Sequence, residues 1–155
     1  MHVWKVRNDL LIRGMFDKRP DKLDELQELG VTSVICMLRK TDPDLENLDW
    51  LTYRNFPTPD TNRDGIDAID PKATQSLNAA AFHAVREISE GKKVLIHCIS
   101  AKDRTPTAAA IALTILEGIS GSAALMRVRS IKPTTFTNKS FIKYLNSILP
   151  LEVWR

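Results

Sequence analysis

Short apolar runs and longer amphipathic stretches alternate along this chain. Apolar runs such as 94–96, and alternating apolar residues such as those of 50–56, predict strands, because successive side chains of a strand point to opposite faces. Apolar residues spaced three or four apart predict helices that bury one side. By these patterns we expect strands within residues 1–8, 10–12, 31–38, 50–56 and 94–96, and helices over 20–29, 70–90, 107–117, 120–131 and 138–149.

The order of these segments predicts an α/β fold. Strands and helices interleave along the chain, with no repeat, low-complexity tract or linker between them. Capping residues support the limits of the longest predicted helix, since Asp70 suits the N-cap, Pro71 the first helical position and Gly91 the end. We therefore expect a single domain over residues 1–155, built on a central mixed, largely parallel sheet of about five strands flanked by helices.

Composition narrows the class of protein. The chain has 155 residues, of which 43% are hydrophobic and 26% charged, values typical of a folded soluble domain. The net charge of +3 is too small to argue for a nucleic-acid partner. We find no apolar run of membrane-spanning length, no signal peptide and no cluster with metal-ligand spacing, so we expect no membrane span, metal or cofactor. The sequence has two cysteines and no pattern of cysteines that would form disulfides, which fits a reducing compartment. We therefore expect a cytoplasmic protein.

The richest chemistry lies in the stretch VLIHCISAKDRTPT, residues 94–107. An apolar strand leads into His97 and Cys98, five residues follow, and Arg104 and Thr105 are then followed by the alanine-rich stretch that begins at Thr107. Backbone N–H groups at a helix N-terminus present unpaired donors and the positive end of the helix dipole, which favour an anion. The sequence therefore predicts an anion-binding loop between a central strand and a buried helix.

Two side chains of this loop suit phosphate chemistry. Arg104 has a planar fork of donors that can bind two phosphate oxygens at once. The positive field of the loop would favour the thiolate form of Cys98, and a thiolate facing a bound phosphate is a nucleophile. Taken alone, Cys98 would be a buried core residue and Arg104 a solvated surface charge, so the interpretation depends on their occurrence together at this spacing.

The segment HCISAKDRT resembles the H-C-x5-R-[S/T] signature loop of the cysteine-dependent protein tyrosine phosphatases. The continuation RTPT and the pattern of elements elsewhere in the chain are similar to small dual-specificity phosphatases. The resemblance implies that Cys98 forms a phosphocysteine, that Arg104 binds the phosphoryl oxygens, and that Thr105 assists the leaving thiolate. It further implies that His97 supports the loop and that the phosphate is bound by the loop residues Ile99, Ser100, Ala101, Lys102, Asp103 and Arg104.

One loop position departs from the family pattern. The family often has glycine where Ala101 stands, at a position that can require a positive φ angle. Alanine adopts such an angle less readily, so we expect a difference in loop geometry or in rate at this position.

Hydrolysis of a phosphate ester also needs a proton for the departing oxygen, which a carboxylic acid can deliver. The polar loop 57–70 carries four aspartates, and Asp60 is our first candidate, because the preceding segment resembles the context of the acid in the phosphatase family. Asp64 and Asp67 are alternatives in the same loop, and each aspartate could equally be a turn-forming residue. Asp103 is a fourth candidate, although its simpler role is to pair with Lys102 or to cap backbone donors of the signature loop.

The sequence leaves the substrate class open. A chain of this length has little room for the loops that deepen the cleft of larger tyrosine-specific phosphatases, so a dual-specificity protein tyrosine/serine/threonine phosphatase is expected. Lys102 favours an alternative, a phosphoinositide or inositol-phosphate phosphatase, in which added positive charge meets a multiply phosphorylated ring. An inactive phosphate-binding docking module is the alternative from another class.

Cys36 raises a question of redox control. It lies near the end of a strand predicted to neighbour the signature strand, and in some relatives a cysteine so placed forms a protective disulfide with the nucleophile. The simpler interpretation is a buried core cysteine.

Overall fold

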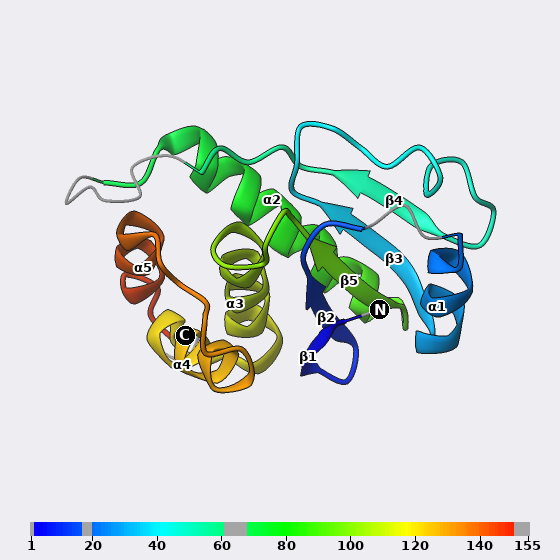
Figure 1. The fold of residues 1–155 in the computed structure, drawn as a ribbon. Helices are drawn as coiled ribbons and strands as arrows, with labels where there is room; N and C mark the ends of the chain where they lie inside the picture. The colour runs from blue at the N-terminus through cyan, green and yellow to red at the C-terminus, as the bar shows by residue number, and fades with distance from the viewer. Residues whose placement is uncertain (1, 17–19, 61–67, 151–155) are drawn as a thin grey trace.

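A sheet of five strands runs through the computed structural model of the chain, which describes residues 2–16, 20–60 and 68–150 (Figure 1). The strands are β1 (Trp4–Arg7), β2 (Leu10–Arg13), β3 (Val31–Cys36), β4 (Thr52–Asn55) and β5 (Lys93–His97). The helices are α1 (Lys22–Leu29), α2 (Pro71–Ser89), α3 (Arg104–Glu117), α4 (Gly121–Ile131) and α5 (Lys139–Asn146). The predicted α/β fold with a mixed, mostly parallel sheet is confirmed.

Strand β5 lies at the centre of the sheet. The strand order is β1-β2-β5-β3-β4, in which β1 and β2 are antiparallel and every other neighbouring pair is parallel. Because parallel strands end at the same edge, the segments that follow β2, β3, β4 and β5 all lie along one edge of the sheet. The predicted signature loop follows β5 at the middle of that edge.

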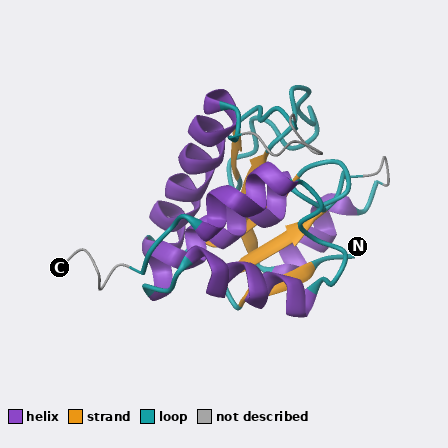
Figure 2. Ribbon diagram, turned by 90° about the vertical axis from the view of Figure 1, so that its left-hand side faces the viewer, coloured by secondary structure: helices purple, strands orange, loops and turns teal. Residues whose placement is uncertain are grey.

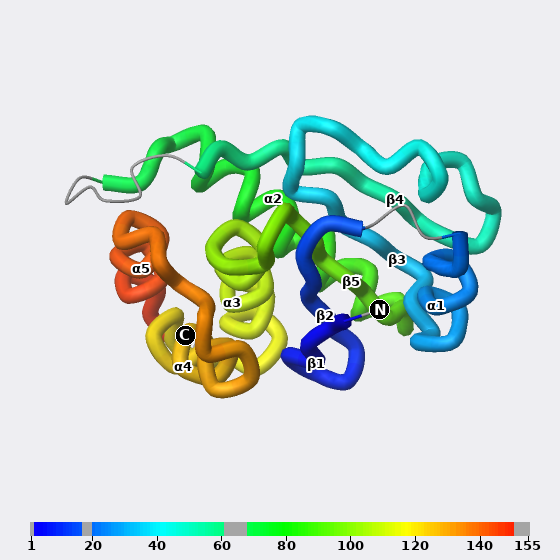
Figure 3. Tube along the Cα trace, viewed as in Figure 1, coloured from blue at the N-terminus to red at the C-terminus, as the bar shows by residue number. Residues whose placement is uncertain are grey.

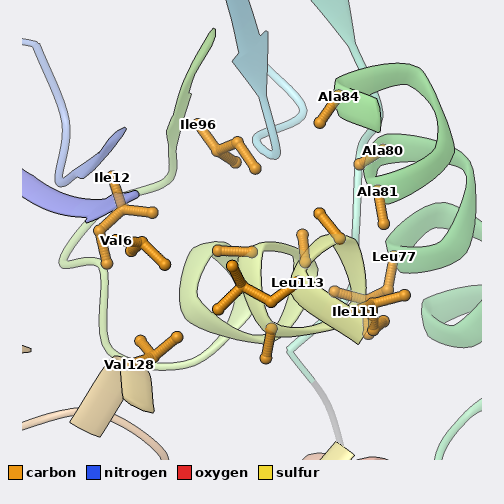
Figure 4. Close-up of a cluster of buried hydrophobic side chains, with 14 of the residues drawn as sticks. Val6, Ile12, Leu77, Ala80, Ala81, Ala84, Ile96, Ile111, Leu113 and Val128 are labelled. Atoms are coloured by element: carbon orange, nitrogen blue, oxygen red, sulfur yellow. The ribbon is translucent and has the colours of Figure 1, made fainter. Parts of the chain in front are cut away.

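The sheet has a different cover on each face. On one face, buried side chains of β1, β2, β3 and β5 pack against α2, α3, α4 and α5, and Figure 4 shows Ile12 and Ile96 of the sheet opposite Leu77 of α2 and Leu113 of α3. On the other face, Leu11, Val34 and Leu95 pack against α1 and the segment before β4. Figure 2, turned so that the side of α4 and α5 faces the reader, shows helices standing in front of the strands.

Helix α3 is the most deeply buried helix of the fold. Its side chains from Thr105 to Thr114 are all buried, as expected of an alanine-rich helix that packs on the sheet and on neighbouring helices at once. It begins at Arg104, three residues before the predicted start at Thr107, so that Arg104 and Thr105 belong to its first turn. Arg104 and Thr105 therefore lie at the positive end of a 14-residue helix.

Other predicted elements agree with the structure apart from their ends. The strands predicted over 1–8, 31–38 and 50–56 extend further than β1, β3 and β4, which are each shorter by two or more residues. Asp70, Ser120 and Asn138 are N-caps whose side chains accept backbone N–H groups of the following turn. Within the described part of the chain, no helix combines the length and the apolar character needed to cross a membrane.

Candidate active site

The segment of residues 98–103 connects the central strand to the N-terminus of α3. Strand β5 ends at His97, and Arg104 is the first residue of the helix. Ile99, Ser100 and Lys102 are exposed, whereas Cys98, Ala101 and Asp103 are buried. The predicted phosphate-binding residues thus form one loop, with the thiol at its first position and the guanidinium just after its last.

Carbonyl groups anchor this loop on two sides. The carbonyl of Ile99 accepts the Met15 N–H at 2.8 Å, and the carbonyl of Lys102 accepts the Phe136 N–H at 2.7 Å. In a trans peptide the next N–H points opposite to the carbonyl, and no described peptide bond is cis. The N–H groups of Ser100 and Asp103 therefore point away from the anchoring segments, as a loop that binds an anion through backbone donors requires.

Gly14 allows one of these anchoring segments to approach. A Cβ atom at position 14 would lie 2.7 Å from the carbonyl oxygen of Ile99, closer than such atoms approach. Close backbone contact with the signature loop is therefore the reason for glycine at this position.

The sulfur of Cys98 is buried at the base of the loop and accepts a backbone donor. The N–H of Ala101 lies 3.3 Å from Cys98 Sγ, and only 2% of the cysteine is exposed. The loop therefore fixes the position of the sulfur and directs a backbone donor at it.

Ala101 adopts the strained backbone that the departure from glycine suggested. Its φ angle is +55°, in the left-handed region, where a residue with a Cβ atom pays about 1–2 kcal/mol. The contact of its N–H with Cys98 depends on this conformation. Hydrogen bonds to the Ile99 and Lys102 carbonyls hold the loop on either side of Ala101, so the left-handed conformation is kept in spite of its cost.

Arg104 joins the signature loop to the loop that follows β4. Its Nη1 donates to the carbonyl of Thr58 at 3.3 Å, and the side chain remains partly exposed. Thr58 is buried, and its N–H donates to the carbonyl of Met37 at 3.1 Å. The guanidinium therefore has one hydrogen-bond partner among the described residues and further donors with which to bind an anion.

Thr105 lies one residue further along α3 and is completely buried. Its hydroxyl group has no hydrogen-bond partner among the residues that the structure describes. Burying a hydroxyl without a partner is unfavourable, and such groups are frequently retained for chemistry. This fits a hydroxyl that is kept available beside the loop.

The four candidate acids have different surroundings. Asp60 is partly exposed, and its Oδ1 accepts the side-chain amide of Asn138 at 2.9 Å. Asp103 is 3% exposed and accepts three donors, the backbone N–H groups of Thr137 and Asn138 and the hydroxyl of Thr137. Its carboxylate thus anchors the segment before α5. Asp64 and Asp67 lie outside the described residues.

His97 precedes the nucleophile and is enclosed by protein. Its ring stacks edge-on against Phe16, with 4.8 Å between centroids, and only 3% of the residue is exposed. It also lines a cavity of about 470 Å³ bounded by segments that follow β2 and β3. Burial, reinforced by the charge of Arg13, lowers its pKa to about 4. His97 is therefore neutral near pH 7. Among the described residues its two ring nitrogens have no hydrogen-bond partner, and its contact with Phe16 is one of packing, so its supporting role stays a prediction.

Acidification should destabilise the protein partly through His97. Its folded-state pKa of about 4 lies below the ordinary value of 6.5. Between these values the unfolded chain binds more protons, so the free energy of unfolding decreases as the pH falls. We expect His97→Asn to remove about 2 kcal/mol of the stability loss between pH 7 and pH 4.5, measured by urea unfolding. His2→Asn, at an exposed position, is the control, and an unchanged pH slope in His97→Asn would contradict the prediction.

Two lysines add positive charge near the thiol. Lys102 is exposed within the loop, and Lys132 is 5% exposed, with its ammonium 4.7 Å from the ring centroid of Trp4. Burial lowers the pKa of Lys132, as does the charge of Lys102, whereas Cys98 and Asp103 act to raise it. The sequence did not identify Lys132, because nothing in the polar segment after α4 indicates that this segment folds back to the signature loop.

Cys36 lies on the opposite face of the sheet from the nucleophile. Its neighbours Val34 and Leu95 face α1, whereas Ile96 and Cys98 face α3, and Cys36 is two residues from Val34. Both thiols are free, and Cys36 Sγ accepts the Leu38 N–H at 3.4 Å. This placement favours a buried core cysteine over a disulfide partner of Cys98.

The described residues contain no cluster of histidine, cysteine and carboxylate side chains that could hold a metal ion. The groups that the site offers are a thiol, a guanidinium, backbone donors and a carboxylic acid. These groups suit nucleophilic attack on a bound phosphate ester.

Comparison with known proteins agrees with this geometry. The family described as the tyrosine phosphatase family matches residues 3–120 of the chain. The chain belongs to the tyrosine phosphatase family. A relative within this family is the dual specificity protein phosphatase PHS1 of Arabidopsis thaliana, 23% identical over 142 residues, which make up 90% of this chain. The chain spans only 14% of the length of that relative.

Solved phosphatase structures share the fold. DUSP15 superposes with a TM-score of 0.76 at 19% identity, covering 93% of this chain and 85% of its own. Tk-PTP in its active form superposes with a TM-score of 0.70 at 23% identity, covering 93% and 95%. A human tyrosine phosphatase-like serine/threonine/tyrosine-interacting protein superposes at 0.74, with 18% identity and 92% of each chain covered. The predicted likeness to small dual-specificity phosphatases is thus confirmed for family and fold.

Proposed function

We propose that this protein is a phosphomonoester hydrolase that acts through a phosphocysteine on Cys98, with phosphorylated tyrosine, serine and threonine residues of proteins as substrates. The observation that carries the proposal is the arrangement of the signature loop. Cys98 Sγ receives the Ala101 N–H at 3.3 Å, and the loop ends on Arg104 at the N-terminus of a buried helix. A bound phosphate would meet the thiolate, the guanidinium and the helix dipole together.

The proposed reaction has two steps. In the first, the thiolate of Cys98 attacks phosphorus, the bond from phosphorus to the ester oxygen breaks, and the departing oxygen takes a proton from Asp60. In the second, water attacks the phosphocysteine, Asp60 takes a proton from that water, and the S–P bond breaks to release phosphate and the thiolate. Arg104 and the loop N–H groups stabilise the phosphoryl oxygens in both steps, and Thr105 donates to the departing thiolate.

A phosphoinositide or inositol-phosphate substrate is the second candidate. It is supported by the exposed Lys102 in the signature loop and by Lys132 behind it, which add positive charge beyond that needed for one phosphate group. An inactive module that only docks phosphoproteins is less well supported, since binding alone requires no thiolate at the base of the loop. We further propose that the protein acts in the cytoplasm, a location supported by its two free thiols.

Turnover of p-nitrophenyl phosphate by the intact chain is the first test. We expect release of p-nitrophenol, and acid quenching during turnover with radiolabelled substrate should trap phosphate on Cys98. A panel of phosphotyrosine and phosphothreonine peptides, inositol phosphates and phosphoinositide vesicles would then identify the substrate class. Faster turnover of the inositol compounds would select the second candidate. Phosphate binding without turnover at any pH from 5 to 8 would overturn the enzymatic proposal in favour of the docking module.

A further inference from the structure

The segment between α4 and α5 is bonded directly to the signature loop. Figure 3 shows this segment in orange, running past α3 toward α5. The Phe136 N–H donates to the Lys102 carbonyl at 2.7 Å, and the N–H groups of Thr137 and Asn138 each donate to Asp103 Oδ1 at 2.7 Å. The Thr137 hydroxyl donates to Asp103 Oδ2 at 2.5 Å. The buried carboxylate of Asp103 thus fixes the position of Asn138 relative to the loop.

The orientation of the Asn138 amide follows from its partners. Its Oδ1 accepts the backbone N–H groups of Ser140 at 3.0 Å and Phe141 at 3.4 Å, as the N-cap of α5. Backbone N–H groups only donate, so the atom that faces them must be the oxygen. The amide nitrogen is therefore directed away from the helix, where it donates to Asp60 Oδ1 at 2.9 Å. Asn138 is completely buried, which leaves this orientation no freedom.

This contact holds one oxygen of the Asp60 carboxyl group in a fixed position. The nitrogen of an amide donates and does not accept, so Asp60 Oδ1 is held as an acceptor. We propose that Asn138 is a positioning residue that orients Asp60 as the general acid. Asp103 holds these two residues in a fixed position relative to the signature loop. The inference rests on the proposed function of the site.

The link to the acid is independent of the one through Arg104. Arg104 contacts the acid-bearing loop at the Thr58 carbonyl, two residues before Asp60, and positions its backbone. Asn138 contacts the carboxyl group itself. Loss of Asn138 should therefore affect proton delivery while phosphate binding by the loop is retained.

Asn138→Ser is the variant that tests this role. Serine is a good N-cap, so α5 keeps its cap, but the shorter side chain has no amide to reach Asp60. We expect kcat for phenyl phosphate, whose leaving group needs a proton, to fall about tenfold or more, and kcat for p-nitrophenyl phosphate to fall less than about threefold. Ser120→Ala removes the N-cap of α4 and is the control for simple loss of a cap, with both rates expected to stay near wild type.

A double variant separates positioning from a merely structural effect. Asp60→Asn should slow phenyl phosphate more than p-nitrophenyl phosphate, and adding Asn138→Ser should slow it no further, because the two residues act as one unit. Additive losses in the double variant, or equal slowing of both substrates by Asn138→Ser, would overturn the proposal.

A measurement without turnover keeps this inference distinct from the proposed function. The side-chain amide of Asn138 should give an NMR signal that is protected from exchange in the intact chain and that shifts in Asp60→Asn. If no phosphate ester is turned over, the proposed function fails. If the amide signal is unchanged by Asp60→Asn, the positioning role fails whatever the activity.

Discussion

We expect Cys98→Ser to lower the turnover of p-nitrophenyl phosphate by more than about 10³-fold. The serine hydroxyl has nearly the same size as the thiol, but it stays protonated near pH 7 and cannot act as the anionic nucleophile. The Ala101 N–H, the helix N-terminus and Arg104 are untouched by the change. Inorganic phosphate should therefore still bind within about threefold of its wild-type affinity, measured by calorimetry, because loop donors and dipole supply that binding.

Cys36→Ala is the matched control for this variant. Cys36 is also a buried, free thiol, but it lies on the face of the sheet that α1 covers. We expect its loss to leave turnover within about threefold of wild type, at some cost in stability from the lost side chain. Substantial turnover in Cys98→Ser, or an equal loss in Cys36→Ala, would refute the assignment of the nucleophile.

The second large effect concerns Arg104. We expect Arg104→Lys to lower kcat/KM about 10²- to 10³-fold even though the positive charge is retained. A lysine ammonium is a point donor, so it cannot bind two phosphoryl oxygens as a planar fork does while another nitrogen holds the Thr58 carbonyl. Steady-state kinetics with p-nitrophenyl phosphate would measure the loss.

The separate changes in kcat and KM identify the cause of the loss in Arg104→Lys. Binding of phosphate in the ground state and stabilisation of the transition state both use Arg104, so kcat should fall and KM should rise together. Arg86→Lys, at an exposed position on α2, should change neither. Wild-type kcat/KM in Arg104→Lys would show that charge alone suffices and would remove the bidentate role.

Local patterns predicted most of the fold because each element carries its own signal. The helix 70–90 has its N-cap and its apolar stripe in the sequence, and α2 occupies nearly the same residues. The run Val94–Ile96 is apolar on both faces, which indicated a strand covered on both sides, and β5 is the central strand. The loop that follows it combined two chemically informative residues at a fixed spacing, so Cys98 and Arg104 could be singled out as candidates before the structure.

The remaining parts of the site depend on contacts between distant segments. Asn138 is 78 residues from Asp60, and its sequence signal is that of an N-cap, which its oxygen indeed fulfils. The second role, carried by the nitrogen, depends on how α5 sits beside the loop after β4. Asp103 was expected to pair with Lys102 or to cap donors of its own loop, but its carboxylate accepts groups of Thr137 and Asn138, which no local pattern could identify.

The start of α3 shows how tertiary structure moved a boundary. Pro106 and the polar residues before it delayed the predicted start to Thr107, yet proline is well tolerated in a first helical turn. The Thr107 N–H bonds to the Asp103 carbonyl at 2.9 Å, which begins the helix earlier.

The face on which Cys36 lies could also have been predicted. Side chains alternate along β3, so Cys36 shares with Val34 the face of the sheet that is away from α3.

The order of strands sets different local stabilities for the two reacting groups. Cys98 follows β5, which is paired on both sides, whereas the loop to Asp60 leaves β4, which is the edge of the sheet. Edge strands open more readily than central ones, so amide exchange should be faster at Phe56, whose N–H donates to the Cys36 carbonyl across β3 and β4, than at Ile96, and equal rates would contradict this. On warming, the acid should detach from the site before the thiol does. The protein would then still capture phosphate esters but would release product only from those with good leaving groups.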